Sequence, residues 1–93
     1  MRFEWDAKKA SDNFVKHGVT FFEAREVFYD PNALDEHDAG HSTAEARFFI
    51  IGLSSRRLLF VVYTEPEADV VRIISARRAV RTEREVYEQE TIS

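Results

Sequence analysis

The sequence predicts a single α+β domain: an N-terminal strand and two helices, followed by an antiparallel meander sheet and a C-terminal helix. Three apolar runs, Arg47 to Leu53, Leu58 to Glu65 and Val70 to Ala76, are separated by only a few residues, which favours hairpins over crossover connections. Two helical patterns precede these runs and a third follows them. With 93 residues and no linker or repeat, we expect residues 1–93 to form one unit.

The N-terminal region predicts a strand and a helix. "RFEW" alternates and is rich in aromatic residues, so Phe3 and Trp5 would share one face of a short strand. Asp6 is a suitable N-cap for the helix that follows. The apolar stripe of this helix includes Phe14, and Gly18 is expected to end it.

The second helix and the later elements follow from capping and turn signals. Thr20 with Glu23 three positions later is a capping box, and Asp30-Pro31 would stop this helix. A short strand around Ala33 to Asp35 and a polar loop come next. The final helix is expected to begin at Arg81 or Thr82, with Thr82 to Glu85 as a second capping box.

Composition and charge exclude several classes of function. The chain has no cysteine, which excludes disulfides, thiolate metal sites and thiol catalysis. It contains no apolar run of the roughly 18 residues that a membrane span needs, nor a signal-peptide core, so we expect a cytoplasmic protein without membrane contact. The net charge of −4 is unevenly distributed, because residues 46–84 carry eight Lys/Arg against four Asp/Glu.

Arginine is concentrated in "RIISARRAVRTERE", residues 72–85, against the overall negative charge. Guanidinium groups form planar forks that match phosphate oxygens, so this cluster indicates an anion-binding surface. The alternative is a solvated helix start whose arginines pair with neighbouring glutamates.

The motifs together resemble one known family. "FEWDAKKASDNFVKHGVTFFEAREVFYDP", "HSTAEARFFIIGLS" and "VVYTEPEADVVRIISARRAVRTEREVY" are similar to the BrnT-type toxins and span nearly the whole chain. The resemblance implies a RelE-like ribonuclease fold, RNA as substrate and neutralisation by a BrnA-type antitoxin, with operator DNA bound only through that complex. It also implies cleavage without a metal or other cofactor, in which the RNA 2′-hydroxyl attacks the adjacent phosphate.

Such a reaction needs cations near the phosphate. Arg77 and Arg78, at the end of the last strand, are the first candidates for stabilising the developing charge, against the alternative of ion pairs with Glu83 or Glu85. Arg72 lies between apolar neighbours on the same strand and is a further catalytic candidate. Arg47 begins an earlier strand and is a candidate for RNA binding or an ordinary exposed residue.

The remaining candidates supply phosphate contacts and proton transfer. Lys9, Asn13 and Lys16 fall on one stripe of the first helix and either contact RNA or form its solvated face. His17 titrates near neutral pH and is a candidate acid or base, or a helix C-cap. Glu65 is a weaker candidate base, with Tyr63 as an orienting hydroxyl.

Two further groups favour ordinary structural roles. The "HDAGH" loop places His37 and His41 four residues apart, but a loop does not align both imidazoles, so no metal site is expected. The phenylalanines are predicted to form core, although an exposed Phe22 or Tyr29 could stack on a base. The rival to the ribonuclease hypothesis is a non-catalytic module that binds an antitoxin and, in complex, operator DNA.

Overall fold

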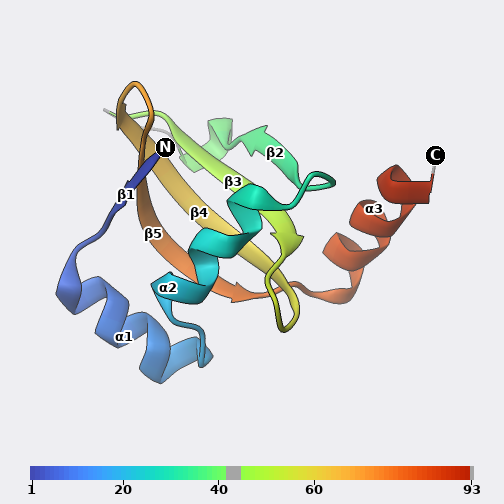
Figure 1. Ribbon diagram of the computed structural model, residues 1–93, viewed down its shortest axis with the longest axis horizontal. Coiled ribbons are helices and arrows are strands. Elements are labelled where there is room, and N and C mark those ends of the chain that lie inside the picture. The colour runs from blue at the N-terminus through green and yellow to red at the C-terminus, as the bar shows by residue number, and fades with distance from the viewer. Residues whose placement is uncertain (42–44, 93) are drawn as a thin grey trace.

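The computed structural model describes residues 1–41 and 45–92, except for the side chains of His41 and Ile92, and it confirms the predicted α+β class (Figure 1). Its strands form one five-stranded sheet in the order β1-β5-β4-β3-β2, in which β1 runs parallel to β5 and the other pairs are antiparallel. The elements in chain order are β1 (Arg2–Glu4), α1 (Ala7–His17), α2 (Phe21–Ala24), the 3-10 helix η1 (Arg25–Tyr29), β2 (Leu34–His37), the 3-10 helix η2 (Ala39–His41), β3 (Arg47–Leu53), β4 (Leu58–Glu67), β5 (Val70–Arg78) and α3 (Arg81–Ile92).

The predicted caps of the first two helices form. The Asp6 carboxylate accepts the backbone N–H groups of Lys8 and Lys9, and Gly18 ends α1 in the left-handed region at φ 69°. The Thr20 hydroxyl accepts the N–H of Glu23 at 3.0 Å. The second helix departs from expectation, because it keeps α geometry for four residues only and then tightens into η1.

The start of α3 differs from the predicted capping box of Thr82 and Glu85. The helix begins at Arg81, and the Glu83 carboxylate accepts the N–H of Val80 at 2.9 Å. Glu85 instead pairs with Arg81 at 3.0 Å on the exposed side of the helix. Glu83 thus lies in the first turn of α3, on the side of the helix that faces the sheet.

The main core lies between the sheet and the α1, α2 and η1 layer. Fully buried side chains from both layers meet there, including Phe21, Val27, Leu59, Val61 and Ile73. In Figure 1 the α2 region crosses one face of the sheet, α1 lies beside the β5 end of the layer, and α3 extends away from the strands on the other side. The opposite face has a smaller cluster, in which Tyr87 of α3 packs with Ile51 and Leu58.

Two polar contacts fasten the helical layer to the sheet. Glu23 is almost completely buried and receives two hydrogen bonds from the Arg57 guanidinium, at 3.0 and 2.8 Å. The hydrogen bonds from Arg57 are the largest influence on the pKa of Glu23; with the bond from Ser54 and the charge of Arg57 they outweigh burial, which acts in the opposite direction, and leave this pKa below its ordinary value. Arg57 also donates to the carbonyl of Gly18 at 2.9 Å, so the β3–β4 turn is tied to the α1–α2 turn.

Candidate functional site

The candidate site lies on the sheet face turned away from α1 and α2, which we call the open face. Alternation along the strands sends Phe48, Leu59 and Val71 into the main core, so their neighbours Arg47, Phe60 and Arg72 point to the open face. Thr64 pairs in register with Arg47 on one side and Arg72 on the other. The open face therefore carries a row of two arginines at one end of the central strands.

A β-bulge in β5 decides which C-terminal arginine joins this face. Val62 pairs with Ser75 and Tyr63 with Ile73, so Ile74 is an extra residue in the register. Without the bulge, Arg72 and Arg77, five residues apart, would point to opposite faces. The shift puts Arg77 opposite Phe60 on the open face, whereas Arg78 pairs with Leu59 on the helical side.

Arg77 is held in a fixed orientation by two neighbours. Its guanidinium forms a two-pronged ion pair with Glu83, at 2.9 and 2.8 Å. The Arg77 guanidinium carbon lies 4.2 Å from the centroid of the Phe60 ring, which is a cation–π contact. The ion pair with Glu83, which the sequence offered as the alternative role of Arg77, is therefore present in the structure.

Glu83 is a charged acceptor at neutral pH. Its burial favours the protonated form, but hydrogen bonds from Arg77 and from the N–H of Val80, with the charge of Arg77, outweigh burial and leave the pKa of Glu83 below its ordinary value. An ionised carboxylate can accept a proton, which is the chemistry of a general base. The sequence suggested Glu83 only as an ion-pair partner of Arg77.

A pocket of about 440 Å³ opens next to this pair, between α3 and strands β2, β3 and β4. Its floor is mainly apolar and includes Phe49 and Phe60, whose rings are stacked with centroids 5.0 Å apart. Polar side chains at its rim come from β2 and from the first turn of α3. The lining residues are Leu34, Glu36, His37, Phe49, Ile51, Phe60, Thr82, Glu83 and Val86.

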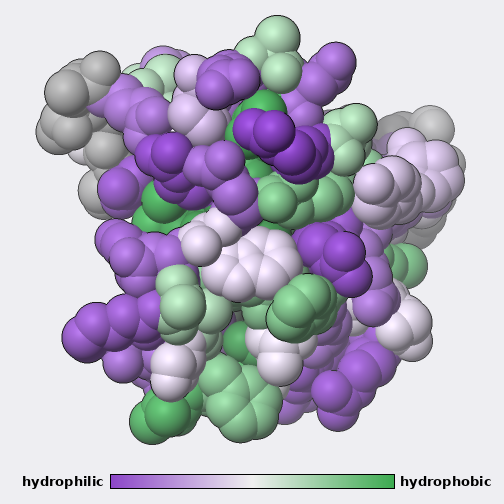
Figure 2. All heavy atoms as spheres, turned by 60° about the vertical axis from the view of Figure 1, so that its left-hand side comes forward, coloured by the Kyte–Doolittle hydropathy of each residue, from purple (hydrophilic) through white to green (hydrophobic). Residues whose placement is uncertain are grey.

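The aromatic residues are divided between the core and the surface, and the two exceptions that the sequence allowed, Phe22 and Tyr29, are both exposed. Phe21 is fully buried, whereas Phe49 and Phe60 are half-buried on the open face. Phe22 and Tyr29 are exposed and border a shallow hollow beside β1. Figure 2, with β1 and α1 turned forward, shows hydrophobic groups among hydrophilic ones on this side.

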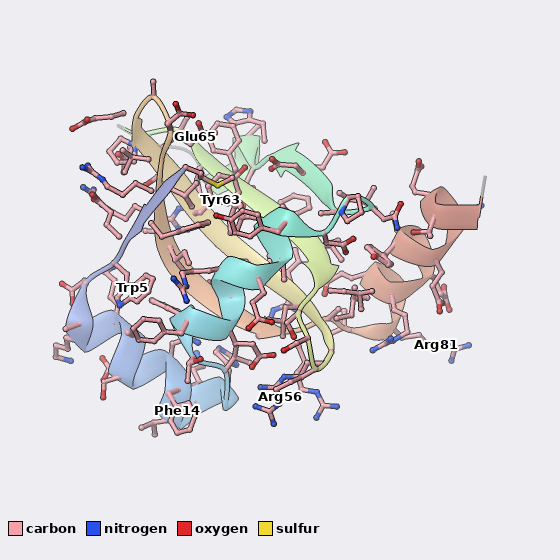
Figure 3. All side chains as sticks on the ribbon, viewed as in Figure 1. Trp5, Phe14, Arg56, Tyr63, Glu65 and Arg81 are labelled. Atoms are coloured by element: carbon pink, nitrogen blue, oxygen red, sulfur yellow. The ribbon has the colours of Figure 1, made fainter. Side chains whose placement is uncertain are left out.

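The acid–base candidates His17 and Glu65 lie away from Arg77. His17 borders a hollow between α1 and β5, together with Lys9 and Lys16. Phe60 is the register partner of Arg77, and Glu65 lies five residues further along β4. The backbones of Glu65 and Arg77 are therefore about 17 Å apart. Figure 3 shows Tyr63 and Glu65 at the end of β4 remote from Arg81 and the start of α3.

Tyr63 and Asn13 have structural surroundings. Burial, with the neighbouring carboxylates, raises the pKa of Tyr63 far above its ordinary value, and its hydroxyl donates to Asp35 at 2.5 Å. Asn13 is buried, with its amide bonded to both backbone groups of Ala76 and to the carbonyl of Val19. Asn13 therefore does not lie on the exposed stripe expected to contact RNA, whereas Lys9 and Lys16 do.

Arg72, Arg47 and Arg78 have different environments. Arg72 pairs with Glu4 of β1 at 2.7 Å and remains partly exposed. Arg47 is half-buried. Arg78 is exposed, and no side-chain partner for it is found within residues 1–41 and 45–92. Of the predicted catalytic residues, Arg72 and Arg77 share the open face, but they lie toward opposite ends of β5.

The described residues hold no group of three or more His, Asp or Glu side chains arranged to bind a metal ion. The histidine pair predicted not to bind metal is described only in part, because the side chain of His41 lies outside the described set. His37 ends β2, contacts the ring of Phe48 at 5.4 Å and lines the pocket. His37 therefore lies at the end of a strand, on the rim of the pocket that Glu83 also lines, and not in the polar loop that the sequence predicted for it.

The fold is that of a known ribonuclease toxin. The crystal structure of the Brucella abortus ribonuclease toxin BrnT matches with a TM-score of 0.67 and 23% identity, covering 87% of this chain and 99% of that one. The family model described as the ribonuclease toxin BrnT of type II toxin-antitoxin systems matches residues 5–83. The chain belongs to this family of ribonuclease toxins. Among curated protein sequences, none matches it.

The family match confirms the resemblance seen in the sequence, and it implies an antitoxin partner and an RNA substrate. The individual site residues are not tested by it and stay predictions. Within the described part of the chain, no helix is both long and apolar enough to cross a membrane.

Proposed function

We propose that this toxin is an endoribonuclease that cleaves RNA without a metal ion, by attack of the 2′-hydroxyl on the adjacent phosphate, and that a BrnA-type antitoxin neutralises it. The observation that carries this proposal is the Arg77–Glu83 pair at the mouth of the apolar pocket. Together with His37 on the rim, it supplies the three functions that the reaction needs: charge stabilisation, a base and an acid.

Arg77 is the residue proposed to stabilise the pentacoordinate phosphate. Its two terminal nitrogens donate to Glu83, and Nη1 also donates to the carbonyl of Arg78 at 3.2 Å, which leaves Nε–H and the second hydrogen of Nη2 for phosphate oxygens. Phe60 and Glu83 hold the guanidinium in place, so little reorganisation is needed when charge develops. Arg78, exposed at the same strand end, and Arg72, further along the open face, are proposed as supporting cations.

Glu83 is proposed as the base that removes the 2′-hydroxyl proton, and His37 as the acid that protonates the leaving 5′-oxygen. The pKa of Glu83 lies below its ordinary value, so this carboxylate is ionised at neutral pH, and the imidazole of His37 carries ring nitrogens that can hold and donate a proton. Both line the same pocket. His17 and Glu65 stay untested candidates, but their positions away from Arg77 favour Glu83 and His37.

Lys9 and Lys16 on α1, and Arg47 on β3, are proposed to hold the RNA backbone outside the reacting centre. They lie on different sides of the sheet, so a bound strand would have to pass around the edge formed by β5. Operator DNA is proposed to bind only through the antitoxin complex. In the rival function, a non-catalytic binding module, the same surfaces would contact protein and DNA without cleaving RNA.

The proposal is tested by incubating the purified chain with a defined RNA in EDTA. We expect discrete fragments whose 5′ products end in a 2′,3′-cyclic phosphate, because the attacking oxygen belongs to the substrate. Co-expression with the cognate antitoxin should suppress both cleavage and growth arrest. Folded protein that leaves RNA intact under all conditions would refute the enzymatic proposal in favour of the binding module.

A further inference from the structure

The pocket beside Arg77 has the size and lining of a site for one aromatic ring system. Its volume of about 440 Å³ falls within the roughly 300–1,000 Å³ typical of small-ligand sites. Phe49 and Phe60 form its floor as a stacked pair inclined by 19°, and Leu34, Ile51 and Val86 complete the apolar surface. Because Phe60 is covered by the Arg77 guanidinium and stacks with Phe49, the ring of Phe49 offers the remaining flat surface, and such aromatic faces bind nucleobases by stacking.

The polar rim of the pocket includes one carboxylate, that of Glu36, without an ion-pair or hydrogen-bond partner among the described residues. Glu83 has little capacity left for recognising a base, because both of its oxygens accept from Arg77 and one also accepts the Val80 N–H. Glu36 of β2 is exposed and lines the pocket, and no ion pair or hydrogen bond of its side chain is found among the described residues. A free carboxylate is an acceptor of two parallel hydrogen bonds.

The position of Arg77 relates the pocket to the RNA backbone. The guanidinium lies over the Phe60 ring, which also stacks with Phe49, so a base stacked on Phe49 can extend its ribose and phosphate past the edge of Phe60 toward the cation. We propose that this pocket binds the nucleobase immediately 5′ to the scissile phosphate, that Glu36 selects guanine there, and that the pocket thereby sets the cleavage site. This inference rests on the proposed function for its link to cleavage.

Guanine is the base that fits because of its hydrogen-bonding edge. Its ring N1–H and its exocyclic amino group are two adjacent donors, which match the two oxygens of one carboxylate. Adenine and cytosine present one amino group beside an acceptor nitrogen, and uracil presents an N–H between two carbonyl oxygens. A carboxylate therefore repels part of every other base while pairing fully with guanine.

The experiment compares four short oligonucleotides in which a single nucleotide keeps its 2′-hydroxyl and all the others lack a reactive one. That nucleotide is G, A, C or U in turn, and the four substrates are otherwise identical. Wild-type protein should cleave the G substrate with the highest kcat/KM. Glu36→Gln should lower the preference for G over the other bases by about tenfold or more, the scale of losing one bidentate base contact. Glu88→Gln, an exposed glutamate of α3 outside the pocket, is the matched control and should keep the wild-type preference.

A binding measurement separates this inference from the proposed function. Guanosine 3′-monophosphate should shift NMR signals of Phe49 and Phe60 in the wild-type protein, whereas uridine 3′-monophosphate should shift them much less. If the nucleotide binds there but no RNA is cleaved, the pocket assignment stands and the enzymatic proposal fails. Cleavage with unchanged base preference in Glu36→Gln, or nucleotide shifts confined to other surfaces, would overturn the pocket assignment.

Discussion

Asn13 connects the helical layer to the strand that carries Arg77, and its removal provides a quantitative test of the structure. The side chain amide donates to the carbonyls of Ala76 and Val19, at 2.8 and 3.0 Å, and its oxygen accepts the Ala76 N–H at 3.0 Å. The short β1 strand pairs β5 only at Val70 to Arg72, so Asn13 occupies the edge of β5 beyond that pairing. It therefore satisfies backbone groups that would otherwise be left at an unpaired edge.

The expected cost of Asn13→Ala follows from these three bonds. A buried polar group left without a partner costs about 1–3 kcal/mol, and three such groups lose their partner here, although some will recruit water. The better helix propensity of alanine returns roughly 0.5 kcal/mol. We therefore expect a loss of about 3 kcal/mol, which would lower Tm by about 12–24 °C in a chain of this size.

The assay is thermal and urea unfolding followed by circular dichroism, with two further variants. Ser11→Ala, at an exposed position of the same helix, is the control and should change stability by less than about 0.5 kcal/mol. Asn13→Asp keeps the acceptor for Ala76 N–H but loses both donations, so it should be no more stable than Asn13→Ala. A loss below about 1 kcal/mol in Asn13→Ala would refute this account of the β5 edge.

Two further predictions concern the Glu23–Arg57 pair and the α1 lysines. Because the folded pKa of Glu23 is lowered, its contribution to stability is present above its ordinary pKa and is lost as pH falls below about 4.5. Glu23→Gln should therefore lower the free energy of unfolding by about 3–5 kcal/mol at pH 7, because it leaves the charge of Arg57 uncompensated. Urea unfolding at several pH values should also show a smaller loss of stability below about pH 4.5 in the variant than in the wild type. An equal loss in both proteins would contradict the role given to Glu23. Lys9→Ala with Lys16→Ala should weaken RNA binding and reduce the slope of log K against log salt by about 1–2, measured by filter binding at several salt concentrations, and an unaltered slope would make these lysines ordinary solvated surface.

Local signals in the sequence were sufficient for much of the fold. The N-caps at Asp6 and Thr20 form as predicted, because such a cap depends only on residues two or three positions apart, whereas the Glu23 carboxylate bonds to Arg57 and Ser54 and not back to Thr20. The meander formed by β3 to β5 also follows from short connections. The parallel pairing of β1 with β5 was not predicted, because it joins residues about 70 positions apart and has no local signature.

The candidate site was predictable only in part, and the reason is the bulge in β5. The arginine cluster marks the correct strand, but strict alternation would place Arg78, and not Arg77, on the face of Arg72. The extra residue at Ile74 reverses that assignment, and a bulge of this kind leaves no reliable mark in the amino-acid sequence. Glu83 and His37 were missed as catalytic candidates for a related reason, since they meet only across the pocket.

The most direct test of the central claim is the single-turnover rate of RNA cleavage in EDTA by wild type, Arg77→Ala and Arg84→Ala. Arg84 is an exposed arginine on α3 that has the same charge but lies outside the pocket lining, so its removal controls for net charge. If Arg77 stabilises the reacting phosphate, Arg77→Ala should lower the rate by about 10²-fold or more while circular dichroism shows a folded chain, and Arg77→Lys should restore it only partly. Equal rates for wild type, Arg77→Ala and Arg84→Ala would contradict the placement of the active site at the Arg77–Glu83 pair.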